Sequence, residues 1–169
     1  MSSDAPQARP PAASISFTTS CAGVALADEN GEGVVGLAPG CAMMPIRTSG
    51  MIDDSSIEAL FNHARENGAD VISMSFGATG MSSHWSTDNA LQYAYNAGVT
   101  LLAATGNEND SAISYPAVNT NVIAVGAASP CGDRKRSSSD PDEVSDGINT
   151  DPNGYTCDGE RWWGSNYGS

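Results

Sequence analysis

An asparagine in a glycine turn is the residue of this sequence best suited to chemistry. The apolar run Val99 to Ala104 predicts a buried strand, and Thr105, Gly106 and Asn107 follow it directly. Open parallel sheets gather their functional groups beyond the carboxyl ends of the strands. A neutral carboxamide held there can donate a hydrogen bond to an oxyanion, and glycine lets the backbone come close. Asn107 is therefore a candidate oxyanion donor, although a turn asparagine considered alone is usually structural.

Two histidines are the candidates for proton transfer. His63 falls on a predicted helix beside its apolar stripe, and His84 falls in a loop before Trp85. Each is most simply a surface or partly buried histidine. The sequence also contains no Gly-x-Ser-x-Gly nucleophile elbow. These residues alone therefore predict neither a general base nor a nucleophile.

The elements that would position Asn107 alternate between short apolar runs and helical patterns. A core-facing helix is predicted by apolar residues at i, i+3, i+4 and i+7, namely Ile57, Leu60, Phe61 and Ala64. We expect a second helix over 88–96, a strand over 42–46, and buried strands over 71–76, 99–104 and 121–127. Gly68 and Gly98 fall where each helix should stop. This alternation predicts an α/β fold with a parallel sheet.

Composition narrows the possible partners. The chain has 169 residues, 40% of them hydrophobic, and a formal net charge of -13. A packed domain is expected from residue 14 onward, after a flexible Pro/Ala-rich tail over 1–13. The acidic charge repels phosphate backbones, so nucleic acid is not an expected partner. No apolar run is long enough to span a bilayer, and Met1 to Ser14 lacks the pattern of an export signal.

Turn signals dominate a stretch over about 130–160, which predicts a surface insertion. Four cysteines occur without Cys-x-x-Cys spacing, at Cys21, Cys41, Cys131 and Cys157. A zinc site is therefore disfavoured. A Cys131–Cys157 disulfide that clamps the insertion and buried free thiols are both consistent with the sequence.

Several segments resemble, in order and spacing, the subtilisin-like serine peptidases, the subtilase family. They are Gly33 to Pro39, Asn67 to Gly77, Ala103 to Asn107, Ser114 to Ala117, and Asn121 to Ala127. A joint match of ordered segments is far more specific than any one of them. The resemblance covers Ser20 to Ala127 and implies a doubly wound parallel sheet, here incomplete.

The resemblance also implies roles for particular residues. Asn107 would be the oxyanion donor, and the backbone of Ser75, Phe76 and Gly77 would pair with an extended substrate strand. Tyr115–Pro116 would be a cis peptide bond. An extended peptide or protein is thus the implied substrate, and an extracellular location is typical of the family.

The catalytic residues of the family are not found where the pattern places them. The family's His-Gly-Thr corresponds to Phe17, Thr18 and Thr19, and phenylalanine cannot accept a proton. No Gly-Thr-Ser-Met-Ala-like nucleophile segment occurs, so we expect the chain to end before it. The family's aspartate has no assignable counterpart. We therefore expect an endopeptidase domain that is partial and inactive alone.

Calcium is the only cofactor that the sequence suggests. An EF-hand-like spacing of oxygen ligands and glycine occurs at Asn149, Asp151, Asn153, Gly154 and Glu160. Its flanks are not helical, so a plain Asp/Asn turn is the competing interpretation. Asp28 and Asn30 lie where many subtilases hold a structural calcium.

Two further functional hypotheses follow. The chain could be a non-catalytic module, derived from a subtilase, that binds peptides or calcium. Alternatively, it could be a fragment whose partner is the missing remainder of its own domain, which would supply the serine.

Overall fold

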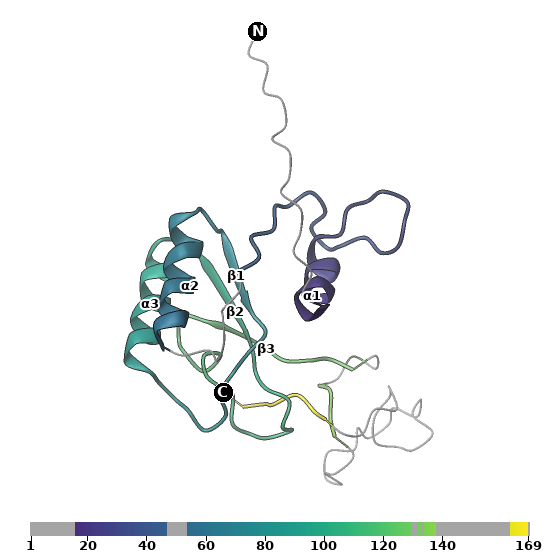
Figure 1. The fold of residues 1–169 in the computed structure, drawn as a ribbon. Helices are drawn as coiled ribbons and strands as arrows, with labels where there is room; N and C mark the ends of the chain where they lie inside the picture. The colour runs from purple at the N-terminus through teal and green to yellow at the C-terminus, as the bar shows by residue number, and fades with distance from the viewer. Residues whose placement is uncertain (1–15, 47–53, 130–131, 133, 138–162, 169) are drawn as a thin grey trace. The chain divides into compact units, whose positions relative to one another are not determined.

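The computed structural model describes residues 16–46, 54–129, 132, 134–137 and 163–168 (Figure 1). The predicted tail over 1–13 and most of the predicted insertion lie outside these residues. The chain divides into two compact units, Met1–Arg47 and Thr48–Ser169, and each is described by itself. Among the described residues, no helix has both the length and the apolar character needed to cross a bilayer.

The first unit contains one helix, α1 (Ser16–Leu26), and a loop that returns to the end of that helix. The backbone N–H groups of Leu37 and Ala38 donate to the carbonyls of Val24 and Ala25, at 3.1 and 2.8 Å. These bonds satisfy carbonyl groups that the last turn of a helix leaves without partners. The loop therefore caps α1.

The predicted strand over 42–46 is wrong, because residues 41–46 are described and none of them is in a strand. Two physical reasons account for the difference. Pro45 has no N–H with which to join a ladder. The described part of this unit also contains no strand with which the run could pair. An apolar run alone therefore did not make a strand.

The second unit is built on a three-stranded parallel sheet in the order β1-β2-β3. The strands are β1 (Val71–Met74), β2 (Thr100–Ala104) and β3 (Ile123–Val125). Two helices, α2 (Asp54–Glu66) and α3 (Trp85–Asn96), lie side by side on one face of the sheet (Figure 1). The predicted incomplete α/β fold with parallel strands is confirmed.

The core lies between the helices and the sheet. The buried side chains of the helices are Phe61, Ala64, Leu91 and Ala94, and those of the strands are Ile72, Met74, Leu101 and Ala103. Two residues of the predicted apolar stripe are confirmed as core residues, since Phe61 and Ala64 are 1% and 2% exposed. Gly68 and Gly98 follow the two helices with positive φ angles of 78° and 86°, as expected.

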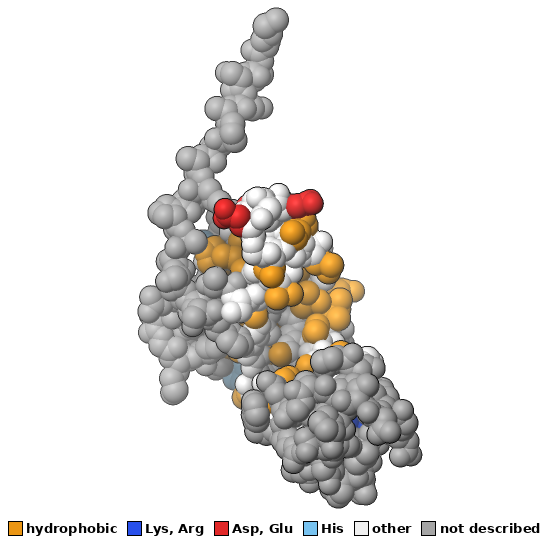
Figure 2. All heavy atoms as spheres, turned by 90° about the vertical axis from the view of Figure 1, so that its right-hand side faces the viewer, with side chains coloured by type: hydrophobic (Ala, Val, Ile, Leu, Met, Phe, Trp, Pro, Cys, Tyr) orange, Lys and Arg blue, Asp and Glu red, His pale blue; other side chains and the backbone are white. Residues whose placement is uncertain are grey.

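The opposite face of the sheet does not have the burial that we predicted. Ile123 and Val125 of β3 are 55% and 48% exposed, and Val71 of β1 is 55% exposed. The third strand exists, but its predicted burial is wrong: every residue of β3 is exposed, and α2 and α3, the helices described in this unit, lie on one face of the sheet. Large apolar side chains are also exposed in the first unit, among them Val24, Val34 and Leu37, and Figure 2 shows hydrophobic side chains at the surface.

Candidate functional site

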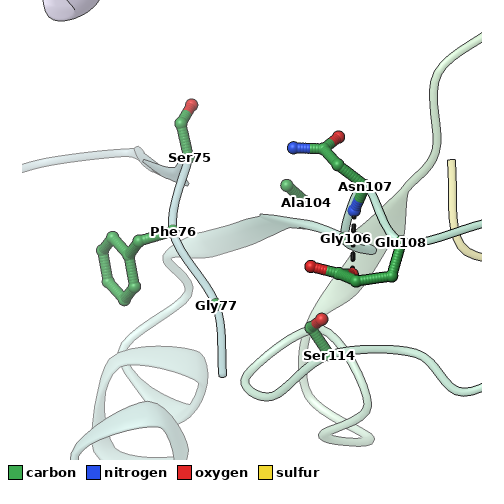
Figure 3. Close-up of a pocket in the computed structure, with 8 residues that line it drawn as sticks. All are labelled: Ser75, Phe76, Gly77, Ala104, Gly106, Asn107, Glu108 and Ser114. Atoms are coloured by element: carbon green, nitrogen blue, oxygen red, sulfur yellow. Dashed lines mark hydrogen bonds between the residues drawn. The ribbon is translucent and has the colours of Figure 1, made fainter. Parts of the chain in front are cut away.

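A pocket lies where β1 and β2 end. The strands are parallel and pair Met74 with Ala103, so the residues that follow them come together at one edge of the sheet. The pocket is lined by Ser75, Phe76, Gly77, Ala104, Gly106, Asn107, Glu108 and Ser114 (Figure 3). The structure therefore brings together the two segments that the sequence analysis assigned to substrate binding.

Asn107 presents an exposed carboxamide to this pocket. Its backbone N–H donates to Oε2 of Glu108 at 3.0 Å. Its side chain extends toward the side of the pocket where Ser75 lies, away from the Glu108 carboxylate (Figure 3). Among the described residues this carboxamide makes no hydrogen bond, so it can donate to a ligand oxygen. The arrangement has the chemistry of an oxyanion donor.

A segment far along the chain holds the turn that carries Asn107. Asn166, which is 3% exposed, uses its whole side-chain amide on residues of this turn. Its Oδ1 accepts from the N–H groups of Glu108 and Asp110, at 2.9 and 3.1 Å. Its Nδ2 donates to Oε2 of Glu108 at 2.7 Å and to the carbonyl of Ala112 at 3.0 Å. The backbone of Asn166 adds a bond to the carbonyl of Gly106 at 3.0 Å.

Sequence reasoning did not assign Asn166 to the site. The available signal was a Ser-Asn-Tyr-Gly string after a long loop, and such a string is also typical of an ordinary turn. Because Asn166 lies 58 residues from Glu108, the contact is visible only in the folded chain.

The wall opposite Asn107 is held by a separate set of contacts. Ala78 and Tyr115 exchange two backbone hydrogen bonds, of 2.8 and 3.0 Å. The Tyr115 hydroxyl donates to Oδ1 of Asp88 at 2.9 Å, and the Asn119 amide donates to the same oxygen at 2.7 Å. Tyr115–Pro116 is a cis peptide bond, as predicted. Residue Asp88 of α3 therefore ties this wall to the helical layer.

Neither histidine reaches the pocket. His63 is exposed on α2, where its Nδ1 lies 3.3 Å from the Asn67 amide nitrogen. His84 precedes α3, and its backbone N–H donates to Oδ2 of Asp88 at 3.0 Å. Both sit at the surface or partly buried, as expected. Phe17 lies in the first turn of α1, in the other unit.

The calcium candidates gain no support from the described residues. The N–H of Asn30 donates to the carbonyl of Asp28 at 3.1 Å, and Oδ1 of Asn30 accepts from the N–H of Glu32 at 3.0 Å. The first bond is that of a γ-turn and the second that of an Asx turn, so both are typical of a plain turn. No group of three or more His, Cys, Asp or Glu side chains that could hold a metal occurs in the described part of the chain. The remaining candidates, Asn149, Asp151, Asn153 and Glu160, lie outside the described residues.

The cysteines can be assigned only in part. Cys21 and Cys41 are exposed rather than buried cysteines. Cys131 and Cys157 lie outside the described residues.

Comparisons with known proteins agree on one family. The sequence model of the subtilase family matches residues 13–154. Thermitase from Thermoactinomyces vulgaris is 37% identical over 123 residues, which are 70% of this chain and 43% of thermitase. Subtilisin DY from Bacillus licheniformis is 39% identical over 116 residues, which are 64% of this chain and 42% of that protein. The chain thus spans less than half of the length of these relatives.

Solved structures give the same result for the fold. Sphericase superposes with a TM-score of 0.56 at 30% identity, over 68% of this chain and 44% of that structure. The S41 psychrophilic protease superposes with a TM-score of 0.56 at 31% identity, over the same shares.

Proposed function

Because the chain belongs to the subtilase family, we propose that it carries the oxyanion turn and part of the substrate cleft of a serine endopeptidase. The observation that supports this proposal is the unengaged carboxamide of Asn107 beside the residues that follow β1. A donor that is fixed in place before the substrate arrives stabilises developing charge without reorganisation.

The other side of the cleft suits an extended peptide. Phe76 and Gly77 follow β1 and make no backbone hydrogen bonds to other described residues, until Ala78 pairs with Tyr115. A peptide can therefore add to this segment as a further strand, with main-chain bonds providing affinity. One of its carbonyl groups would then lie within reach of Asn107.

We further propose that these 169 residues bind peptides but do not hydrolyse them. Phe17 stands where the family has its catalytic histidine, and no family-type nucleophile segment occurs in the sequence. An oxyanion donor can stabilise a transition state, but it cannot open a covalent route by itself. A fluorogenic peptide should give no turnover above buffer. Turnover that a serine-directed phosphonate abolishes would refute this part of the proposal.

The binding part is tested with an Asn107→Asp variant, which keeps the shape of the side chain and removes its N–H donors. An extended hexapeptide amide is titrated into both proteins and followed by nuclear magnetic resonance. We expect the variant to lose about tenfold in affinity, because a hydrogen bond to the peptide carbonyl is replaced by repulsion between oxygens. The matched control is Asn62→Asp on α2, which makes the same charge change away from the pocket. Equal affinities for all three proteins would refute a role for Asn107 in binding.

Such a cleft could belong to a stand-alone peptide-binding module or to one portion of a larger domain, and an experiment can distinguish the two. The substitution of Phe17 for histidine favours a stand-alone peptide-binding module. The exposed faces of Ile123 and Val125 favour a portion of a domain that needs its remainder, because parallel sheets are normally covered on both faces. Mixing the chain with a polypeptide that supplies the rest of a subtilase domain, serine included, distinguishes them. A portion of a domain should form a stable complex, whereas a stand-alone module should not.

A further inference from the structure

We propose that Asn166 is the positioning residue of the Asn107 turn, residues 105–109. The proposal rests on the proposed function, since it explains how the oxyanion donor is held. Asn166 does not line the pocket, and its hydrogen bonds go to the residues on either side of Asn107 rather than to Asn107 itself. It acts through Glu108, whose carboxylate lies between the two asparagines.

The first argument is the saturation of the Asn166 amide. A carboxamide offers two N–H donors and one oxygen with two lone pairs. All four positions are used, and every partner lies between Glu108 and Ala112. With the side chain 3% exposed, water cannot replace these bonds. No other residue type of this size supplies both donors and acceptor in this arrangement.

The second argument is the relay through Glu108. One carboxylate oxygen, Oε2, accepts from Nδ2 of Asn166 at 2.7 Å and from the backbone N–H of Asn107 at 3.0 Å. The Glu108 carboxylate thereby holds the backbone N–H of Asn107, while the Asn107 side chain extends in another direction, toward the side of the pocket where Ser75 lies (Figure 3). Loss of the Asn166 Nδ2 donor would leave the Glu108 carboxylate unanchored. The carboxylate could then move away and break its hydrogen bond to the backbone N–H of Asn107.

The third argument is that the turn is shaped around Asn166. Gly106 has a φ of 113°, which side-chain-bearing residues rarely adopt. A Cβ at this position would collide with Nδ2 of Asn166 and lie 2.6 Å from Oε2 of Glu108. The glycine therefore leaves the space that the Asn166 amide and the Glu108 carboxylate occupy.

The test compares variants that remove different parts of the Asn166 amide. Asn166→Asp keeps the oxygen that accepts from the N–H groups of Glu108 and Asp110. It replaces the Nδ2 donor with a carboxylate oxygen, which repels Oε2 of Glu108. Asn166→Ala removes all four bonds. Glu108→Gln, added to Asn166→Asp, removes the repulsion and offers a donor back to Asp at position 166.

Ser165→Ala is the matched control. Ser165 is 1% exposed in the same segment, and its hydroxyl contacts Thr105 Oγ1 at 3.1 Å, the N–H of Ala127 at 2.9 Å and the backbone carbonyl of Asn166 at 3.4 Å, but it makes no hydrogen bond to Glu108 or to the Asn166 side chain. This control should lose stability without moving Asn107.

The readouts in the free protein are hydrogen exchange of the turn amides and the side-chain amide resonance of Asn107. Asn166→Ala should speed exchange of the Glu108 and Asp110 amides by at least about tenfold, whereas Asn166→Asp should speed only that of Asn107. Both should shift the Asn107 side-chain resonance, and Glu108→Gln should restore it in the Asn166→Asp background. Should Asn166→Asp fail to fold, Glu108→Ala, at an exposed position, should still free the Asn107 amide.

These outcomes are independent of the peptide titration. An Asn107 resonance that stays in place in both Asn166 variants, or that Ser165→Ala moves equally, would overturn the positioning role. Absence of peptide binding by the unaltered chain would instead refute the proposed function, and the exchange pattern would still decide the role of Asn166. With both correct, the Asn166→Asp chain should bind the peptide about tenfold more weakly, and the double variant should recover most of the loss.

Discussion

Replacing Gly106 with alanine should destabilise the second unit more than the same replacement at Gly80. A side chain at φ 113° costs about 1 to 3 kcal/mol in backbone strain. The added Cβ would also lie 2.6 Å from Oγ of Ser114 and from Oε2 of Glu108, so the Glu108 carboxylate must move. Moving it weakens its hydrogen bonds to Asn166 and Asn107, at about 0.5 to 1.5 kcal/mol each.

These contributions add up to a loss of about 2 to 6 kcal/mol in the free energy of unfolding. The matched control is Gly80→Ala, because Gly80 also has a positive φ, 74°, but nothing lies within 4 Å of its added Cβ. Its cost should be the backbone term alone, about 1 to 2 kcal/mol. Urea denaturation of both variants, followed by circular dichroism, measures the difference. Equal losses would show that the space at Gly106 is not filled by the Asn166 and Glu108 contacts.

Two further predictions concern stability and use the same denaturation assay. Tyr115→Phe should lower the free energy of unfolding by about 0.5 to 1.5 kcal/mol, because the hydrogen bond from its hydroxyl to Asp88 is lost. The control, Tyr93→Phe at an exposed ring, should leave the free energy of unfolding almost unchanged. Equal effects of the two changes would contradict the tie between α3 and the pocket wall. Leu91→Ala should lower the free energy of unfolding by about 2 to 5 kcal/mol, because the side chain is fully buried and its removal leaves a cavity. The control, Leu37→Ala at a side chain that is 95% exposed, should leave stability unchanged. A loss below about 1 kcal/mol for Leu91→Ala would contradict the core described above.

The parts of the fold that follow from local pattern could be predicted from the sequence. The stripe that contains Phe61 and Ala64 faces the core, and Gly68 and Gly98 end the two helices. Such features depend on residues within one or two turns of each other, so periodicity and glycine placement are enough.

The incorrect predictions concern the neighbours that would pair with or cover a segment, not the apolar pattern of the segment itself. Residues 121–127 have the composition of a buried strand, but burial of Ile123 depends on what lies over the sheet, and its own sequence does not determine that. The run over 42–46 likewise lacked a strand to pair with. An apolar run indicates that a segment can be buried, not that a neighbour is present to bury it.

The residues of the candidate site also differ in whether the sequence could predict them. The segment with Asn107 could be found because it follows an apolar strand of a parallel sheet, and the segment with Ser75 because of its resemblance to the subtilase family. Asn166 could not be found, because its role is defined by contacts that cross 54 to 58 residues of sequence. No local pattern encodes which turn a distant amide will hold.

The distance in sequence between Asn166 and Glu108 also sets an order of events during protein synthesis. The ribosome makes the Asn107 turn first and the residue that holds it 58 positions later. At about 5 to 20 residues per second, that gap lasts about 3 to 12 seconds. During this interval the strands and helices of the second unit can already pack, while the turn at their edge still lacks the bonds from Asn166. The part of this molecule best suited to chemistry is thus among the last to take its shape on the nascent chain.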